Sequence, residues 1–189
     1  MIQVKRTIKA KVETRKLLVG DIIGFTLTDG EYVEAMAVAK GNLGTLFVTV
    51  DCLAKEYRMN PTNTNEGGYE KSELRQKLNG EILDRFPDDI KSLMLPLENG
   101  DLLRIPTERE ITGDNQYGEP DPKAQWEPMK LRRNRMALEG HNGRTQWYWL
   151  QNEDREYASY FASVNLHGDA RYRGASNASG VRPVFLLKS

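Results

Sequence analysis

Two stretches near the end of the chain decide the fold: Trp147-Tyr148-Trp149-Leu150 and Gly180-Val181-Arg182-Pro183-Val184-Phe185-Leu186-Leu187. Alternate residues of a strand share a face, so the first stretch places two indoles together, where they would anchor a core. In the second stretch apolar side chains fall on both faces, which is typical of an interior strand. Pro183 counts against full pairing on one side of that strand, because proline has no N–H to donate.

The first fifty residues predict a short antiparallel β-meander. Residues 21–27 and 32–39 flank Thr28-Asp29-Gly30-Glu31, and Asp-Gly between two apolar runs is a strong hairpin signal. A second turn over residues 40–44 leads into a third apolar run over residues 45–50. Loops this short favour pairing between strands that follow one another in the sequence.

The middle of the chain predicts short helices after a polar loop over residues 60–68. Ser72 is placed to cap a helix, and its side-chain oxygen would accept a hydrogen bond from the first turn. Leu74, Leu78 and Ile82 recur at helical spacing on one face, with an interruption at the glycine that follows Leu78.

Further along, a second helical piece is expected to open at Pro87, and residues 102–105 look like a short strand. Thr107 and Glu110 have the spacing of a capping box, in which each side chain satisfies the other residue's backbone N–H. Residues 113–128 contain three Pro, two Gly and few apolar side chains. They predict a long irregular loop, and such loops are often functional.

The composition is that of a soluble globular protein. The chain has 189 residues, 27 Lys and Arg against 27 Asp and Glu, and a mean hydropathy of −0.64. No apolar run approaches the ~20 residues of a membrane helix, and the start has no apolar stretch typical of a secretory signal. With Cys52 as the single cysteine, we expect no internal disulfide and no structural zinc site. The protein should be cytoplasmic when made and should not insert into a membrane.

The balanced total of charges hides a segregation along the chain. Basic residues dominate positions 1–16, acidic residues dominate positions 66–121, and positions 130–135 are basic again. A basic run can contact phosphates, but the first run alternates with Ile8 and Val12, which predicts a solvated strand face. The net charge of zero and the absence of interleaved aromatic residues argue against a nucleic-acid partner.

The two decisive stretches resemble the end of an uncharacterised protein family from gut bacteria and their phages. Residues 63–79 and 105–111 match the same family. Residues 34–38 and 51–60 are similar to its phage-associated branch. The resemblance covers most of the chain, and its motifs are specific as a set.

The final region of that family is similar to the C-type-lectin-like fold, which also serves formylglycine-generating enzymes and phage receptor-binding proteins diversified by retroelements. In those diversified proteins a last strand ends the domain, and the segment before it displays a binding surface. The resemblance therefore implies an α+β protein, with an N-terminal antiparallel β-meander over residues 1–60 and a C-type-lectin-like binding domain over residues 61–189. It also implies a non-catalytic receptor-recognition protein of phage or prophage origin, with a bacterial surface protein or glycan as its partner.

The candidate contact surface is the polar segment between Gln151 and Asn177. Tyr and Arg supply large contact areas, while Asn and Ser supply adaptable hydrogen bonds, a mixture typical of paratopes. The predicted ligand-binding residues are Asn152, Asp154, Arg155, Tyr157, Tyr160, Asn165, His167, Asp169, Arg171, Tyr172 and Arg173. The alternative for this segment is an ordinary polar surface loop. A separate expectation for the basic N-terminus is that it docks the protein to a larger particle, such as a virion, or to a sister subunit.

Two other classes of function stay open: a metal-dependent sugar binder or enzyme on the same fold, and a purely structural virion component. Formylglycine generation in the similar fold uses a cysteine pair, whereas Cys52 stands alone and is expected to be a buried, inert thiol. His141 and His167 are the only imidazoles, and no local motif pairs them with it. Glu119-Pro120-Asp121 is loosely similar to the calcium-binding loop of C-type lectins, but a Trp-Asn-Asp strand motif is absent. We therefore predict no catalytic residue, metal or cofactor.

Overall fold

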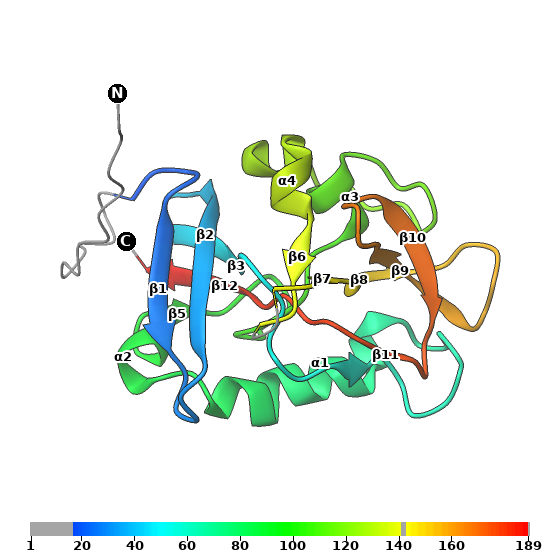
Figure 1. The fold of residues 1–189 in the computed structure, drawn as a ribbon, viewed down its shortest axis with the longest axis horizontal. Helices are drawn as coiled ribbons and strands as arrows, with labels where there is room; N and C mark the ends of the chain where they lie inside the picture. Colours follow the sequence, from blue (N-terminus) through cyan, green and yellow to red (C-terminus); the bar gives the residue numbers. More distant parts are fainter. Residues whose placement is uncertain (1–16, 141–142, 189) are drawn as a thin grey trace.

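The structure combines mostly antiparallel strands with short helices, which confirms the predicted α+β class (Figure 1). This computed structural model describes residues 17–140 and 143–188. The strand face predicted over residues 1–16 and the imidazole of His141 lie outside the described residues. Within the described ranges, no helix is long and apolar enough to cross a membrane.

A five-stranded sheet contains both the predicted N-terminal meander and the predicted last strand. In spatial order its strands are β1 (Ile22–Thr26), β2 (Tyr32–Lys40), β3 (Gly44–Thr49), β12 (Val184–Lys188) and β5 (Met94–Leu95). Every neighbouring pair is antiparallel. The hairpin turn between β1 and β2 places Gly30 at a φ of 92°, a backbone conformation that residues other than glycine rarely adopt.

The last strand is interior, as the sequence predicts. Strand β12 lies between β3 and β5, and its Phe185 and Leu187 side chains are buried. Pro183 comes just before the strand, so its missing N–H removes no ladder bond, and its carbonyl accepts a hydrogen bond from the backbone N–H of Thr49 at 3.0 Å. The domain division at residue 60 stays a prediction, but β12 joins the end of the chain to β3.

A second antiparallel sheet lies at the opposite end of the molecule from β1 (Figure 1). Its three strands are, in spatial order, β10 (Ala170–Gly174), β9 (Tyr160–Val164) and β8 (Tyr148–Glu153). The remaining elements are short: β4 (Tyr57–Arg58), η2 (Tyr69–Lys71), α1 (Glu73–Lys77), η3 (Leu78–Ile82), α2 (Asp88–Lys91), α3 (Glu108–Thr112), η4 (Glu127–Lys130), α4 (Arg132–Arg135), β6 (Ala137–Leu138), β7 (Thr145–Gln146) and β11 (Ala178–Ser179).

The central helical region follows the sequence pattern closely. Ser72 caps α1, and its hydroxyl oxygen accepts a hydrogen bond from a first-turn N–H at 3.1 Å. The predicted interruption is a kink within η3 at Gly80, whose φ of −119° and ψ of −105° are not helical. Leu74, Leu78 and Ile82 are nevertheless all fully buried, so the apolar face continues across the irregularity.

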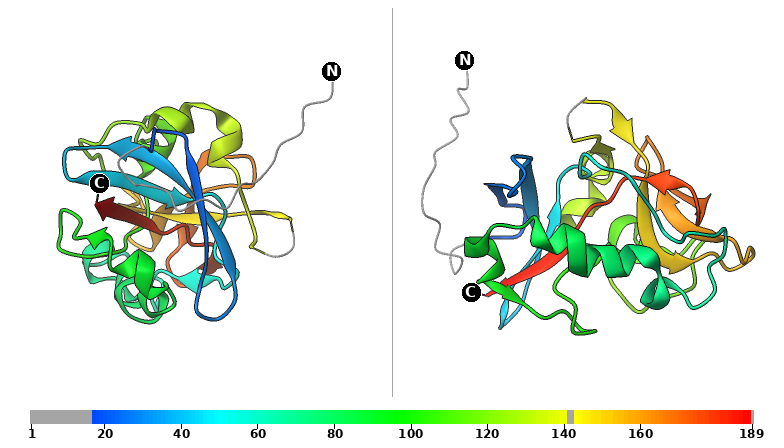
Figure 2. Two further views of the ribbon diagram at one scale, coloured as in Figure 1. Left: turned by 90° about the vertical axis from the view of Figure 1, so that its left-hand side faces the viewer. Right: turned by 90° about the horizontal axis from the view of Figure 1, so that it is seen from below.

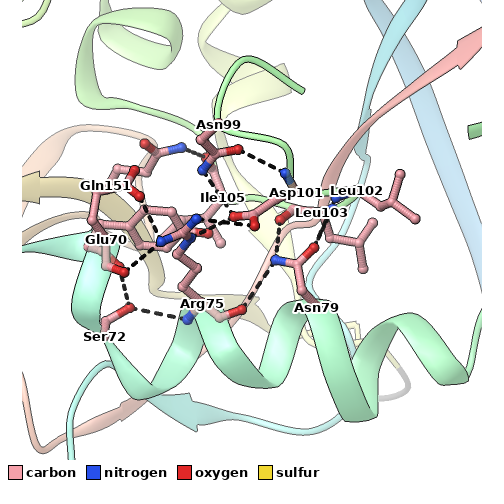
Figure 3. A network of polar contacts seen from close by, with 11 residues as sticks. Glu70, Ser72, Arg75, Asn79, Asn99, Asp101, Leu102, Leu103, Ile105 and Gln151 are labelled. Carbon is pink, nitrogen blue, oxygen red and sulfur yellow. Dashed lines mark hydrogen bonds and ion pairs between the residues drawn. The ribbon is translucent and has the colours of Figure 1, made fainter. Parts of the chain in front are cut away.

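Residues 102–105, predicted as a short strand, form no strand in the structure. The side chain of Asn79 binds this segment instead: its Oδ1 accepts from the N–H groups of Leu102 and Leu103 at 3.0 Å each (Figure 3). Its Nδ2 donates to the Leu103 carbonyl oxygen at 2.8 Å. Only Arg104 makes a β-bridge, with β12. For Leu102 and Leu103 a side-chain amide therefore takes the place of a neighbouring strand.

The core has an aromatic centre beneath the five-stranded sheet. Phe185 lies within 5.6–6.1 Å, between ring centroids, of Phe25, Phe47 and Phe86. Trp149 extends the same cluster toward the second sheet, is fully buried, and donates from Nε1 to a backbone carbonyl at 2.7 Å. This cluster joins the two ends of the molecule.

The prediction that two indoles anchor the core holds for only one of them. Trp149 is in β8, whereas Trp147 precedes the strand and is only partly buried. The guanidinium of Arg173 lies 5.6 Å from the Trp147 ring. Trp147 therefore packs against a charged side chain at the surface, where a cation over an indole is favourable.

Arg182, in the middle of the second decisive stretch, is almost completely buried. Its Nε donates to the carbonyl oxygen of Thr49 at 2.9 Å, and its Nη1 donates to the Tyr148 hydroxyl at 3.2 Å and the Asn134 carbonyl at 3.3 Å. The guanidinium also lies 4.9 Å from the Tyr148 ring centroid. This arginine ties together β3, β8 and the end of α4, so its role is structural.

Candidate ligand-binding surface

Four tyrosines form a continuous aromatic cluster at the second sheet, and we call it the tyrosine platform: Tyr117, Tyr157, Tyr160 and Tyr172. Tyr160 and Tyr172 stack with their ring centroids 5.2 Å apart and their planes at 18°. Tyr157 lies 5.5 Å from Tyr160, and Tyr117 lies edge-on to Tyr172 at 5.3 Å. Aromatic pairs at such separations attract one another, so the rings brace each other in place.

The sheet register explains why two of these rings meet. Tyr172 of β10 lies opposite Ala162 of β9. Tyr160 is two residues before Ala162, so Tyr160 and Tyr172 are diagonal neighbours on the same face. Tyr157 comes from the loop between β8 and β9, and it is 50% exposed, while Tyr172 is 42% exposed. About half of these two side chains is therefore available to a partner.

Tyr117 reaches the platform from the long loop that the sequence predicts over residues 113–128. The buried carboxylate of Glu108 holds this part of the loop by accepting hydrogen bonds from the backbone N–H groups of Gln116, Tyr117 and Gly118 at 2.7–3.3 Å. Burial raises the pKa of Glu108, against the opposing effect of these N–H donors. Glu108 belongs to α3, whose predicted capping box is present.

Two of the predicted contact residues lie beneath the platform and support it. Asn152 is buried; its Oδ1 accepts from the Glu108 N–H at 2.8 Å, and its Nδ2 donates to the Glu119 carbonyl at 2.7 Å. Asp154 is also buried, and its Oδ1 accepts from the N–H groups of Glu156 and Tyr157 at 2.9 Å. These side chains fix the loops that carry Tyr117 and Tyr157.

Two of the predicted arginines border the platform. Arg155 is exposed, and its Nη2 donates to the carbonyls of Asn115 and Gln116 at 3.0 and 2.7 Å. Arg171 is exposed, and its Nη1 donates to the Tyr117 hydroxyl at 3.2 Å. Their hydrogen-bond partners at these contacts are carbonyl and hydroxyl oxygens rather than carboxylates.

The other predicted residues lie apart from the platform. Asn165 forms the turn between β9 and β10, where its Oδ1 accepts from the N–H groups of His167 and Asp169. Asp169 pairs with Arg132 at 2.9 Å, which ties this turn to α4. Arg173 alternates with Tyr172 along β10 and therefore points to the opposite face, toward the partly buried indole described above.

The structure thus brings together five of the predicted contact residues at the platform: Arg155, Tyr157, Tyr160, Arg171 and Tyr172. The sequence analysis did not single out Tyr117, a member of the platform, or Asn65, which binds the backbone of two of its tyrosines. The Asn65 Nδ2 donates to the carbonyls of Tyr157 and Tyr160 at 3.1 Å each. The length of the loop over residues 113–128 was the only signal for Tyr117. No short-range pattern links either residue to β9 and β10.

The loosely lectin-like Glu119-Pro120-Asp121 segment lies near the platform but has its own partners. Asp121 Oδ2 accepts from the side-chain amides of Asn115 at 3.2 Å and Asn152 at 3.1 Å. Burial acts to raise the pKa of Asp121, but hydrogen bonds from Asn152, the Lys123 N–H and Asn115 outweigh it and hold the pKa below its usual value. Among residues 17–140 and 143–188, no group of three His, Cys, Asp or Glu is arranged to hold a metal ion.

Cys52 is buried, as predicted, and burial raises the pKa of its thiol to about 12. The group is therefore protonated at neutral pH, and a protonated thiol is a poor nucleophile. In the described part of the chain the only imidazole belongs to His167, at the far turn of β9 and β10.

A cavity of about 660 Å³ lies away from the platform, between β3 and the loops at residues 96–99 and 123–126. Its floor contains Arg104 and Glu110, a buried and bidentate ion pair with N–O distances of 2.5 and 2.7 Å. The indole of Trp126 lies 5.8 Å from the guanidinium. The charges of this pair are directed at each other rather than into the cavity, as expected for a structural ion pair.

Comparison with known proteins gives one match. The model of a family described as a domain of unknown function (DUF6273) matches residues 43–125. That stretch contains Glu108 and Tyr117 and ends before the second sheet. No curated protein and no solved structure matches the chain significantly. The predicted resemblance to an uncharacterised family is therefore supported for this part of the chain.

Proposed function

We propose that this chain is a non-catalytic binding protein that contacts its partner through the tyrosine platform. The observation that carries the proposal is the pair of half-exposed rings, Tyr157 and Tyr172, held in one aromatic cluster beside Arg155 and Arg171. Tyr and Arg are the residues that most often dominate binding energy at protein interfaces. A rigid tyrosine supplies a large amphipathic surface at a low cost in conformational entropy.

The way the platform is supported agrees with a binding role. Glu108, Asp154 and Asn65 each bind backbone groups of the loops that carry its rings. Binding normally costs free energy when loops and side chains become ordered, and a surface that is ordered beforehand avoids part of this cost.

The proposal extends to a C-type-lectin-like scaffold of phage or prophage origin, with a protein or glycan on a bacterial surface as the partner. This part rests on the residue resemblance. It is consistent with the position of three platform tyrosines, Tyr157, Tyr160 and Tyr172, in the segment that precedes the interior last strand, β12. A near-copy of the 3′ end of the gene, differing at adenines and next to a reverse transcriptase, would support retroelement diversification.

The test is a binding experiment with two defined probes: an array of bacterial glycans and a panel of intact gut bacteria. The double variant Tyr157→Ala/Tyr172→Ala should bind at least about tenfold more weakly than the wild type, because hot-spot truncations cost more than about 1.4 kcal/mol. Tyr157→Phe/Tyr172→Phe keeps both rings and should retain most of the binding if ring contact dominates. Leu43→Ala changes a side chain that is 76% exposed and remote from the second sheet, and it serves as the control.

Circular dichroism must show that each variant keeps its fold. Unchanged binding by a folded Tyr157→Ala/Tyr172→Ala variant would contradict the assignment of the surface. The same conclusion would follow if Leu43→Ala weakened binding as strongly, since the loss would then not be specific to the platform.

A further inference from the structure

The face of the five-stranded sheet that lies opposite the phenylalanine core carries a row of apolar side chains. Leu46 of β3 pairs directly with Leu186 of β12, and Ala39 of β2 pairs with Leu46. Leu46 and Leu186 alternate along their strands with the buried Phe47 and Phe185, so they point to the other face. All three residues of the row are only partly buried, although their strands are interior to the sheet. This face therefore lacks part of the second layer against which a sheet normally packs.

Two loops combine with this row to form the cavity of about 660 Å³ described above. The loop after β5 contributes Pro96 and Leu97, and the loop before η4 contributes Ala124 and the indole of Trp126. In the left panel of Figure 2, β12, in red and ending at the C mark, lies between the blue strands of the meander and the green segment that contains β5. Binding sites for small molecules are typically cavities of about 300–1,000 Å³ with mostly apolar walls and a few polar groups. The size and the lining of this cavity fit such a ligand.

The polar groups of the cavity define the head group that it would accept. Within the described residues, the cationic side chains of its lining are those of Arg104 and Lys123. The guanidinium of Arg104 is committed to Glu110 in the buried bidentate pair, and breaking such a pair is costly. Lys123 pairs instead with Glu98, whose side chain is 86% exposed. An ion pair with an exposed partner contributes little to stability, so this pair can be exchanged for another.

Lys123 is held at the edge of the cavity more firmly than its partner. Its side chain is 27% exposed, and its backbone N–H donates to Asp121 Oδ1 at 2.8 Å. The Lys123 ammonium holds the pKa of Glu98 below its usual value, and the charge of Arg104 acts in the same direction. A carboxylate at this position is therefore stabilised by the cations of the lining. Glu98 occupies the place that the carboxylate of a ligand would take.

The other carboxylates of the lining already have cationic partners and would not repel an anionic head group strongly. Glu110 pairs with Arg104, and Glu70 pairs with Arg75 at 2.7 Å. After displacement by a ligand, the exposed Glu98 side chain would remain in water, where its charge is screened.

We propose that this cavity binds a small amphipathic carboxylate, with its apolar body against Leu46, Leu186 and Trp126 and its carboxylate on the Lys123 ammonium in place of Glu98. The body would cover the apolar row that the second layer leaves partly exposed. The head group would stay at the edge of the cavity, so the charged carboxylate is not buried away from water. The inference is independent of the tyrosine platform, since the cavity contains none of the four tyrosines.

The test is isothermal titration calorimetry of the full chain with sodium octanoate and, separately, with 1-octanol. The two probes have alkyl bodies of similar length and differ in their head groups. We expect octanoate to bind with a dissociation constant below about 1 mM, and octanol to bind at least about threefold more weakly because it carries no charge for Lys123. Absence of saturable octanoate binding to the folded wild type would overturn the proposal, and so would octanol binding that is equally tight.

Two variants at exposed or partly exposed positions should change octanoate binding in opposite directions. Lys123→Met removes the ammonium and should raise the dissociation constant at least about tenfold, whereas Glu98→Gln removes the competing carboxylate and should lower it at least about twofold. Both should leave octanol binding within about twofold of the wild type. The matched control is Lys130→Met, because Lys130 is 57% exposed, also pairs with an exposed glutamate and lies outside the cavity.

Circular dichroism shows whether each variant keeps its fold. An unchanged dissociation constant for octanoate in folded Lys123→Met, or weaker binding in Glu98→Gln, would contradict the assigned head-group position. A loss in Lys130→Met as large as that in Lys123→Met would do the same, because the effect would then be one of total charge.

A second measurement locates the apolar body of the ligand without changing its binding site. In the proton–nitrogen NMR spectrum of the wild type, octanoate should shift the indole N–H signal of Trp126, which is assigned by its absence from Trp126→Phe. Shifts confined to the indole signals of Trp147 and Trp149 would place the ligand elsewhere and would overturn the proposal.

Discussion

Replacing Arg182 by Met tests how the buried guanidinium contributes to stability. The substitution keeps an unbranched apolar stem, which ends about where Nε lies in arginine, and it removes the charge and all of the donors. Three hydrogen bonds disappear: the one to the Thr49 carbonyl at 2.9 Å, and the longer ones to the Tyr148 hydroxyl and the Asn134 carbonyl. The favourable contact between the guanidinium and the Tyr148 ring disappears too.

The magnitude follows from these contacts. Hydrogen bonds to a charged group contribute about 1.5–3 kcal/mol each, and the two longer bonds belong at the low end of that range. The gross loss is therefore about 5 kcal/mol. The substitution also removes the desolvation cost of burying a guanidinium, which is a few kcal/mol, and this offsets part of the loss of stability. We expect Arg182→Met to lower the free energy of unfolding by about 3 kcal/mol.

The assay is urea denaturation followed by tryptophan fluorescence, with the slope of the transition compared between variants. Arg132→Met is the matched control, because Arg132 is 58% exposed and its ion pair with Asp169 should contribute less than about 1 kcal/mol. Arg182→Lys should lose nearly as much as the Met variant, since one ammonium group cannot reach acceptors on three different segments. A loss below about 0.5 kcal/mol for Arg182→Met, on the scale of an average surface substitution, would refute the reasoning.

Two further predictions follow from buried groups. The Cys52 thiol, with its pKa raised to about 12, should be alkylated by iodoacetamide at pH 9.5 at least about a hundredfold more slowly than in the same chain in denaturant, because only a small fraction of the buried thiol is thiolate at that pH. A rate in the folded protein at pH 9.5 within about tenfold of the rate in denaturant would be inconsistent with its burial and raised pKa. Glu108→Ala should remove the acceptor for three loop N–H groups and accelerate hydrogen exchange at residues 116–118 by at least about tenfold, with Glu127→Ala as an exposed control. Unchanged exchange at those positions would show that other contacts hold the loop.

The features that the sequence predicted well depend on residues close together in the chain. The Gly30 turn, the Ser72 cap and the Thr107 capping box each involve a donor and an acceptor within a few residues of each other. Periodicity also placed Leu74, Leu78 and Ile82 in the core correctly, because a helix face is fixed by spacing alone. The interior position of β12 could be predicted for the same reason, from apolar side chains on both faces of the strand.

The features that the sequence missed depend on contacts between distant residues. Residues 102–105 have the composition of a strand, but the side chain of Asn79 binds the backbone of Leu102 and Leu103, and only Arg104 bridges to β12. Trp147 has the spacing of a core residue, but it lies outside the strand that would have turned it inward. Propensity is a weak guide wherever tertiary contacts decide the outcome.

The candidate site contains both features that could be predicted from the sequence and features that could not. The tyrosines of the segment after β8 could be selected from composition, and three of them gather at one surface. Composition does not separate a side chain that faces solvent from one that holds a loop, so Asn152 and Asp154 were placed in the same group. Tyr117 is held at the platform because its backbone N–H donates to the buried carboxylate of Glu108, an arrangement that no local sequence pattern reveals.

The position of β12 has a consequence for how the chain folds. Arg182 and Thr49, which hydrogen-bond at the start of the β3–β12 pairing, are 133 residues apart in the sequence. Contacts of such large separation slow folding, because a long loop must close before they form. During synthesis, β3 would emerge from the ribosome well before its partner, with an unpaired apolar edge in the meantime. We therefore expect this sheet to be completed late, and the nascent chain to depend on protection from aggregation until its last strand has been made.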